Sequence, residues 1–285
     1  MGFSFKHDDW ANKREVVVQN KILKSLIVLS VILCFNFQAQ ALGDQVKDLK
    51  TGFSYLFQGS VKQFTTKNNA YYLGAAIPSL WYSFENDDRL SLNARSKDIP
   101  NYIDIAGDLG VIFGFPVAPL GFYYLGRSNQ DDHMMQFSVE FIAAMYLALA
   151  ESSIISYIPI HDRPVTTGLS RRETDFRGGS SWPSGHIIPF ASLFFKTLQF
   201  YGPAWSIAPA ILTVLTSVQR VRDGKHHVSD VVGAFFISAF ASEGVRAVAG
   251  YKKNHPFYKW IFESDAKLGL VRKGNAVGPR VVWNF

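Results

Sequence analysis

The stretch WPSGHIIPFASLFFKTLQFY, residues 182–201, joins a polar loop to an apolar segment. The loop half combines proline, serine, glycine and histidine. The following fifteen residues are mostly apolar, and Lys196 is the only charged one among them. A run of this length without strict alternation is typical of a buried helix rather than a strand.

Further apolar segments lie on both sides of this stretch. They occupy residues 70–84, 102–126, 134–160, 203–221 and 228–249. Some are shorter than the roughly 20 residues of a membrane span, or carry Asp104, Asp108 or Glu151. Such carboxylates typically form a hydrogen-bonded polar seam in the bundle interior. With no repeat and no strand pattern before the C-terminus, the sequence predicts an all-α, membrane-embedded helical bundle.

Composition is compatible with this class without deciding it. The 285 residues suit a single domain, with 48% hydrophobic and 18% charged residues and 24 phenylalanines. The mean hydropathy of only +0.05 leaves a soluble protein open. The net charge of +6 comes from basic residues scattered among apolar segments. This favours a membrane and a lipid phosphate over nucleic acid as partner. The sequence predicts no oligomeric state.

Residues 1–41 resemble a signal peptide or an N-terminal anchor. Lysines precede the apolar run 25–37, and Ala39-Gln40-Ala41 has the form of a cleavage site. The only cysteine, Cys34, lies inside this segment, so neither an internal disulfide nor a thiolate metal site is expected. A cleaved signal and two crossings, at 102–126 and 134–160, would return the chain to the periplasmic side before the polar loops.

The remaining chain divides into three parts. Residues 42–69 are an amphipathic segment, 70–250 the helical domain and 251–285 a C-terminal tail. In the tail, residues 268–271 and 281–285 are predicted strands of a small hairpin, joined through Gly274-Asn275 and Gly278-Pro279.

Three polar clusters stand at the ends of apolar segments, where a helical scaffold usually presents functional groups. The first is His161-Asp162-Arg163-Pro164 and the second is residues 182–186. The third is Arg220, His226 and Asp230.

Together these residue types suit phosphate transfer. Arginine's planar fork matches phosphate oxygens, which gives Arg163 and Arg220 the role of phosphate binders. Ser184 offers a hydroxyl donor, and Gly185 lets the backbone N–H approach an anion at the start of a helix. His186, at the edge of the same loop, can protonate the leaving oxygen.

His226 and Asp230 are four residues apart, so they share one face of a helix. A carboxylate that accepts one ring N–H fixes the tautomer and leaves the other nitrogen free to attack. His227 points elsewhere in this geometry and is not predicted to react.

Arg163-Pro164, residues 183–186 and the set Arg220, His226 and Asp230 resemble, in order and spacing, the three-part motif of the type 2 phosphatidic acid phosphatase / vanadium haloperoxidase superfamily. The resemblance implies a helical bundle and hydrolysis through a phosphohistidine, without metal or cofactor. It implies His226 as nucleophile, Asp230 as its partner and His186 as acid. It also implies Arg163, Ser184, Gly185 and Arg220 as phosphate binders.

Two positions depart from this family's pattern. Ser156 stands where the family usually has a lysine, and Gln219 where it usually has a serine. Because a lost donor to the transition state typically costs about 3–4 kcal/mol, another cation is expected to replace the lysine. Arg171 and Arg172, in the loop between the first two clusters, are the first candidates, ahead of Arg177 and Lys225.

The sequence therefore predicts an inner-membrane phosphatase with its active site facing the periplasm. Its substrate would be a lipid phosphomonoester or diphosphate. Three alternatives remain: a soluble periplasmic acid phosphatase, a vanadate-dependent haloperoxidase, and a non-catalytic membrane protein of the same fold.

Overall fold

The structure, a computed structural model, describes residues 43–95, 100, 103, 105, 116–164, 178–263, 265–274 and 276–284. The predicted signal or anchor, Asp104 and Asp108 lie outside these residues. The chain divides into two compact units, Met1–Lys50 and Thr51–Phe285. The described residues of the first unit, 43–50, are helical, and the elements that follow belong to the second.

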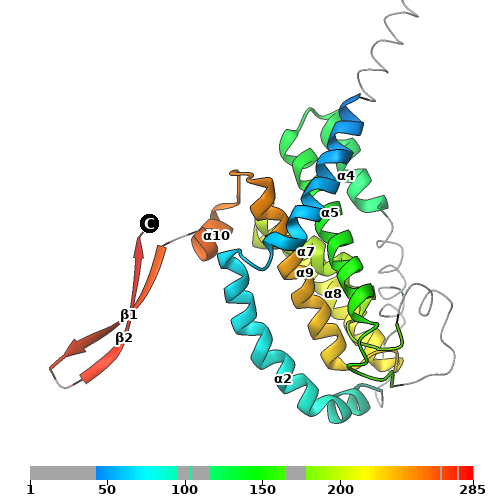
Figure 1. The fold of residues 1–285 in the computed structure, drawn as a ribbon, viewed down its shortest axis with the longest axis vertical. Coiled ribbons are helices and arrows are strands. Elements are labelled where there is room, and N and C mark those ends of the chain that lie inside the picture. Colours follow the sequence, from blue (N-terminus) through cyan, green and yellow to red (C-terminus); the bar gives the residue numbers. More distant parts are fainter. Residues whose placement is uncertain are drawn as a thin grey trace, which may run out of the picture. The chain divides into compact units, whose positions relative to one another are not determined.

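The second unit is mainly helical in its described part, which confirms the predicted all-α bundle (Figure 1). Residues 51–62 form a helix. The larger helices that follow are α2 (Lys67–Arg95), α4 (Val117–Ser128), α5 (Asp132–Ile155), α7 (Ile188–Phe200), α8 (Pro203–Arg222) and α9 (Val228–Ala249), and the short η1 (Gly185–Ile187) leads into α7. The bounds of α7, α8 and α9 agree with the predicted apolar segments to within one residue. Helices α5 and α9 are long and apolar enough to cross a bilayer.

Helix α9 is the centre of the bundle, with contacts to α2, α5 and α7. Its buried face is made of small and branched apolar residues, such as Ala234, Ala241 and Val245, all 0% exposed. A side chain at Gly244 would meet the carbonyl oxygen of Gly59 at 2.5 Å. Only a glycine at position 244 therefore allows the helix of residues 51–62 to lie this close to α9.

A buried ion network joins three helices in the core. Glu140 of α5 accepts from Lys196 Nζ of α7 at 3.1 Å and from Arg246 Nη1 of α9 at 2.8 Å. Lys196 also donates to Gln199 Oε1 at 2.8 Å and to the carbonyl of Ser242 at 2.9 Å. These charges are almost fully buried, and their pairing offsets the cost of removing them from water.

The predicted polar seam stays a prediction, because two of its three carboxylates lie outside the described residues. The third, Glu151, accepts a hydrogen bond from Gln63. The ion network of Glu140, Lys196 and Arg246 is separate from this pair.

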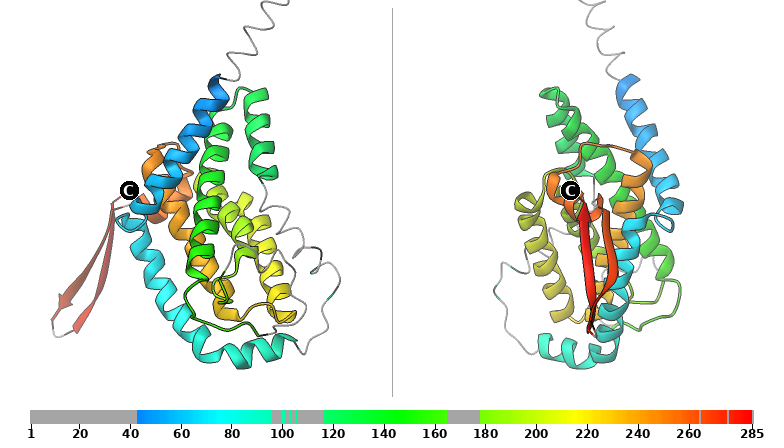
Figure 2. Two further views of the ribbon diagram at one scale, coloured as in Figure 1. Left: turned by 45° about the vertical axis from the view of Figure 1, so that its right-hand side comes forward. Right: turned by 90° about the vertical axis from the view of Figure 1, so that its left-hand side faces the viewer.

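Helix α2 is longer than the apolar segment 70–84 predicts. It begins at Lys67, so the predicted domain boundary after residue 69 falls inside its first turn. It continues through Pro78 and reaches the N-terminal end of α9, where Asp87 Oδ1 accepts from the Ser229 backbone N–H at 2.9 Å (Figure 2). This contact brings a carboxylate from a distant part of the chain to the predicted site.

The beginning of the C-terminal tail packs on the bundle. Within α10 (Pro256–Tyr258), the Tyr258 side chain is 2% exposed, and its hydroxyl donates to Glu243 Oε2 of α9 at 2.5 Å. A π-helical turn, η2 (Lys259–Glu263), follows.

Strands β1 (Asp265–Lys273) and β2 (Ala276–Asn284) pair antiparallel, from Asp265 opposite Asn284 to Lys273 opposite Ala276. Gly278 and Pro279 lie within β2, so their predicted place in the connection is wrong. Gly274, the other glycine of the predicted connection, does make the turn, in the left-handed conformation at φ 62° that glycine adopts without strain.

Candidate active site

Three loops meet at the N-terminal end of α9. They are residues 161–164 after α5, residues 182–186, which run into η1 ahead of α7, and residues 223–227 between α8 and α9. The Ser184 N–H donates to the Asp230 carbonyl at 3.0 Å, and the Ser181 N–H to the His161 carbonyl at 2.8 Å. A guanidinium nitrogen of Arg163 lies 3.4 Å from the carbonyl oxygen of Lys225, to which it donates. Backbone contacts thus hold the three predicted clusters together.

Trp182 fixes the second loop against α9. A side chain at Gly233, three residues after Asp230, would meet the indole nitrogen of Trp182 at 2.5 Å. The absence of a side chain at Gly233 therefore allows the ring to lie on the helix that carries Asp230.

His226 has the geometry of an oriented nucleophile. Its ring is fully buried, and Nδ1 lies 3.2 Å from Asp230 Oδ2. Nε2 makes no hydrogen bond within the described residues. If Nδ1 donates to the carboxylate, Nε2 carries the free lone pair, which is the tautomer that attack requires.

The surroundings keep this imidazole neutral. Burial, opposed by Asp230 and reinforced by the positive charges of Arg220 and Arg163, lowers the pKa of His226 from 6.5 to about 4. The effect of the two arginines shows that both lie near the ring. A neutral imidazole beside two guanidinium groups is suited to attack a group that carries negative charge.

His186 faces His226 across the site. The centroids of the two rings are 6.2 Å apart, and the ring planes are tilted by 59°. His186 is half-buried and is the middle residue of η1. This separation leaves room for a small tetrahedral group between the two imidazoles.

Ser184 directly precedes η1, and Gly185 is the first residue of η1. The Ser184 side chain is 0% exposed, and its Oγ has no hydrogen-bond partner in the described part of the chain. A buried hydroxyl without a partner is costly unless a ligand completes it. Both residues therefore suit an anion in the site, as the sequence predicts.

Ser156, at the position of the family's lysine, has a structural role. It is 0% exposed, and its Oγ accepts from the Gly178 N–H at 2.9 Å and donates to the Ser153 carbonyl at 2.6 Å. A side chain at Gly178 would meet the Ser156 carbonyl oxygen at 2.1 Å. The position thus joins α5 to the second loop and has no space for a long cation. The predicted substitutes Arg171 and Arg172 lie outside the described residues.

Three residues of this region have no predicted role. His161 stacks on His227, with ring centroids 3.8 Å apart, and Asp87 lies 3.9 Å from His161 Nδ1. The backbone N–H of His227 donates to Asp230 Oδ2 at 2.8 Å, so the residue supports Asp230 through its main chain. His161 stands in a predicted cluster, whereas nothing in the sequence connects Asp87 to a loop more than seventy residues away.

A family model described as the PAP2 superfamily matches residues 137–253, a range that contains all three polar clusters. No curated protein and no solved structure matches the chain significantly.

Proposed function

Residues 137–253 place this chain in the PAP2 superfamily, whose members are in general phosphatases, and on this premise we propose that it removes phosphate from a membrane lipid. The substrate is a phosphomonoester or diphosphate, and the reaction passes through a phosphohistidine on His226. The supporting observation is an apolar pocket that begins one residue away from the catalytic groups.

In the first step His226 Nε2 attacks phosphorus while the bond from phosphorus to the leaving oxygen breaks. Arg163 and Arg220 hold the equatorial oxygens, with Ser184 as an additional donor. His186 gives its proton to the leaving oxygen, a contribution of roughly 10²–10⁴ in rate. Asp230 keeps the proton on Nδ1 of His226 and stabilises the charge that develops on the ring.

In the second step a water molecule attacks the phosphohistidine. His186, now neutral, takes a proton from that water, the phosphorus–nitrogen bond breaks, and inorganic phosphate leaves. Side chains fill every role in this route, so EDTA should leave turnover unchanged.

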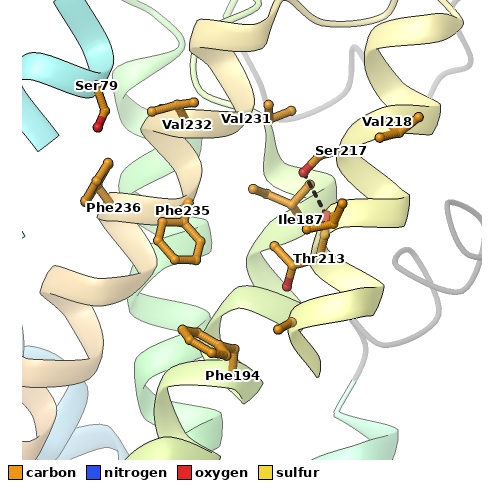
Figure 3. A pocket seen from close by; sticks show the side chains of 12 residues that line it. Ser79, Ile187, Phe194, Thr213, Ser217, Val218, Val231, Val232, Phe235 and Phe236 are labelled. Atoms are coloured by element: carbon orange, nitrogen blue, oxygen red, sulfur yellow. Dashed lines mark hydrogen bonds between the residues drawn. The ribbon is translucent and has the colours of Figure 1, made fainter. Parts of the chain in front are cut away.

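The apolar pocket, about 510 Å³ in volume, lies between α7, α8 and α9 with a contribution from α2 (Figure 3). Ile187, directly after His186, and Val231, directly after Asp230, line it together with Phe194 and Phe235. The two hydroxyls on α8 that also line it are engaged within the helix; for example, Ser217 donates to the Thr213 carbonyl at 2.7 Å. Carbon surface thus dominates the wall, which suits an acyl or isoprenoid chain.

The outer faces of α8 and α2 support a membrane setting. Trp205 (72% exposed), Ile207 (60%) and Val214 (60%) project from α8, and Trp81 (69%) and Ile77 (61%) from α2. Large exposed apolar patches on a monomer mark contact with a membrane or a partner. A tail held in the pocket could pass from here into the bilayer.

Blocking the pocket tests the lipid assignment. Ala210 lines the pocket, whereas Ala208 on the same helix is exposed and does not. Ala210→Trp should lower kcat/KM for phosphatidate or a polyprenyl diphosphate about tenfold or more and spare p-nitrophenyl phosphate. Ala208→Trp is the matched control. Equal loss on both substrate types, or none on the lipids, would contradict the lipid assignment.

Trapping identifies the nucleophile. Rapid acid-free quenching of the purified enzyme with labelled substrate should leave acid-labile phosphate on the wild type and on His227→Ala, and none on His226→Ala. Phosphate retained by His226→Ala would exclude the proposed intermediate.

We place the protein in the inner membrane with its active site toward the periplasm. A carbonate wash should leave it in the membrane fraction. Release by the wash, with activity confined to small esters, would favour the soluble acid phosphatase instead.

A further inference from the structure

The carboxylate of Asp230 lies between two imidazoles. Oδ2 is 3.2 Å from His226 Nδ1, and Oδ1 is 3.4 Å from His161 Nδ1. His161 comes from the loop after α5 and is 23% exposed at its side chain, whereas Asp230 is fully buried. The predicted pair of His226 and Asp230 is therefore one half of a larger group.

Asp87 adds a second buried carboxylate to this group. It is 4% exposed, and its Oδ2 lies 3.9 Å from His161 Nδ1 and makes no hydrogen bond within the described residues. In the described chain the ion pairs of Asp87 and Asp230 involve only histidines. Two buried carboxylates require a positive charge nearby.

His161 is the histidine that can supply this charge. Burial lowers the pKa values of His226 and His227, so both rings stay neutral. The contact with Asp230 raises the pKa of His161; Asp87 and Asp88 of α2 act in the same direction, and burial opposes them.

The remaining neighbours of His161 are compatible with a charged ring. The neutral ring of His227 stacks on it, and the ring of Phe84 lies 5.6 Å away, centroid to centroid. Ser229 Oγ lies 3.4 Å from His161 Nδ1.

A metal ion is the competing occupant of this cluster. One ligand atom each from Asp87, His161 and His227 lies within 4.8 Å of the others. However, the planes of the two rings are stacked at an interplanar angle of 18°. The lone pairs of two stacked imidazoles lie in nearly parallel planes and therefore do not converge on one point, as tetrahedral coordination requires. The arrangement favours a proton over a metal.

We propose that His161 is a positioning residue of the active site, which holds a proton between Asp87 and Asp230 and thereby keeps the Asp230 carboxylate on the imidazole of His226. This inference rests on the proposed function. With a neutral residue at position 161, no positive charge would lie between Asp87 and Asp230, their repulsion would grow, and the orientation of His226 would suffer.

A double-mutant cycle tests this charge balance. His161→Asn should lower kcat about tenfold with KM changed less than twofold, the size expected for an outer partner of a catalytic histidine. Asp87→Asn retains an oxygen for the Ser229 N–H and removes the unbalanced charge. The double variant should therefore recover to within about threefold of the wild type. His133→Asn, a half-buried histidine outside the site, is the control. Losses that simply multiply in the double variant would overturn the proposal.

A second measurement requires no turnover and separates this inference from the proposed function. NMR titration should place the pKa of His161 above its ordinary value, and Asp87→Asn should lower it. A His161 that titrates at or below the ordinary value would overturn the proposal even in an active phosphatase. Stoichiometric zinc binding by the wild type in calorimetry, lost in Asp87→Asn, would overturn it in favour of a metal site.

Discussion

The ionisation of His226 gives the sharpest quantitative prediction. Burial lowers the pKa of this imidazole from 6.5 to about 4. At pH 5 about 90% of such rings are neutral, compared with about 3% for an ordinary histidine. At pH 5 the fraction of His226 in the neutral, nucleophilic form should therefore be about thirtyfold larger than that of an exposed imidazole.

The assay is the acid limb of kcat/KM, which reports ionisations of the free enzyme and the free substrate. Two substrates whose phosphate groups have different pKa values separate these contributions. A limb that moves with the substrate belongs to the substrate, and a limb common to both belongs to the enzyme. We expect no common limb that reports loss of the nucleophile above about pH 5. A common limb near pH 6.5, together with an NMR titration near pH 6.5 in the wild type that is absent from His226→Gln, would refute the reasoning.

The same shift is linked to stability. The unfolded chain protonates His226 near pH 6.5, whereas the folded protein does so near pH 4. Between these values the unfolded state binds more protons, so the free energy of unfolding falls as pH falls. A difference of 2.5 pKa units corresponds to about 3 kcal/mol. Chemical denaturation between pH 7 and pH 4 measures the free energy of unfolding. This free energy should fall by that amount in the wild type and not in His226→Gln. Equal pH dependence in the two proteins would count against a buried neutral ring.

Three further predictions concern the scaffold. Lys196→Met should lower the free energy of unfolding by about 3–5 kcal/mol, because Glu140 loses one of its two cations in the core. The double variant Lys196→Met, Glu140→Gln should recover part of this lost stability. An unchanged denaturation midpoint in Lys196→Met would contradict the role of the network. Ser156→Lys should lower Tm and leave activity no higher, because the position is buried and accepts the Gly178 N–H; a gain in kcat would show that a cation fits there. The contribution of His161 to stability should be complete below its ordinary pKa of 6.5 and should disappear as pH rises through its raised pKa. The difference in unfolding free energy between the wild type and His161→Asn should therefore shrink at alkaline pH. A difference that stays constant with pH would argue against a protonated ring.

Much of the helical scaffold follows from local patterns. Apolar runs of helical length predict α7, α8 and α9 closely, because few polar positions interrupt these runs. The pattern does not separate a core helix from a membrane span. The apolar pattern also does not predict the C-terminal end of α2. The second half of that helix is polar, so no apolar periodicity marks the residue at which it ends.

The candidate site divides in the same way. Residues close in sequence, such as His226 and Asp230, are predicted because helical spacing alone places them on one face. The sequence does not predict the structural role of Ser156, because its hydrogen-bond partner Gly178 lies 22 residues away in another loop. The members of the ion network were likewise individually visible as charges in apolar runs, while their pairing across three helices was not.

The amino-acid sequence alone predicts the helical class, the three polar clusters and the pairing of His226 with Asp230, because each depends on residue type and short spacing. The positions of Asp87 and His161 on the far side of Asp230, and the apolar pocket beside His186, become visible in the folded chain. Those contacts depend on how α2, α5 and α9 pack. Helix packing is set by the combined surfaces of many residues, and no local spacing encodes it.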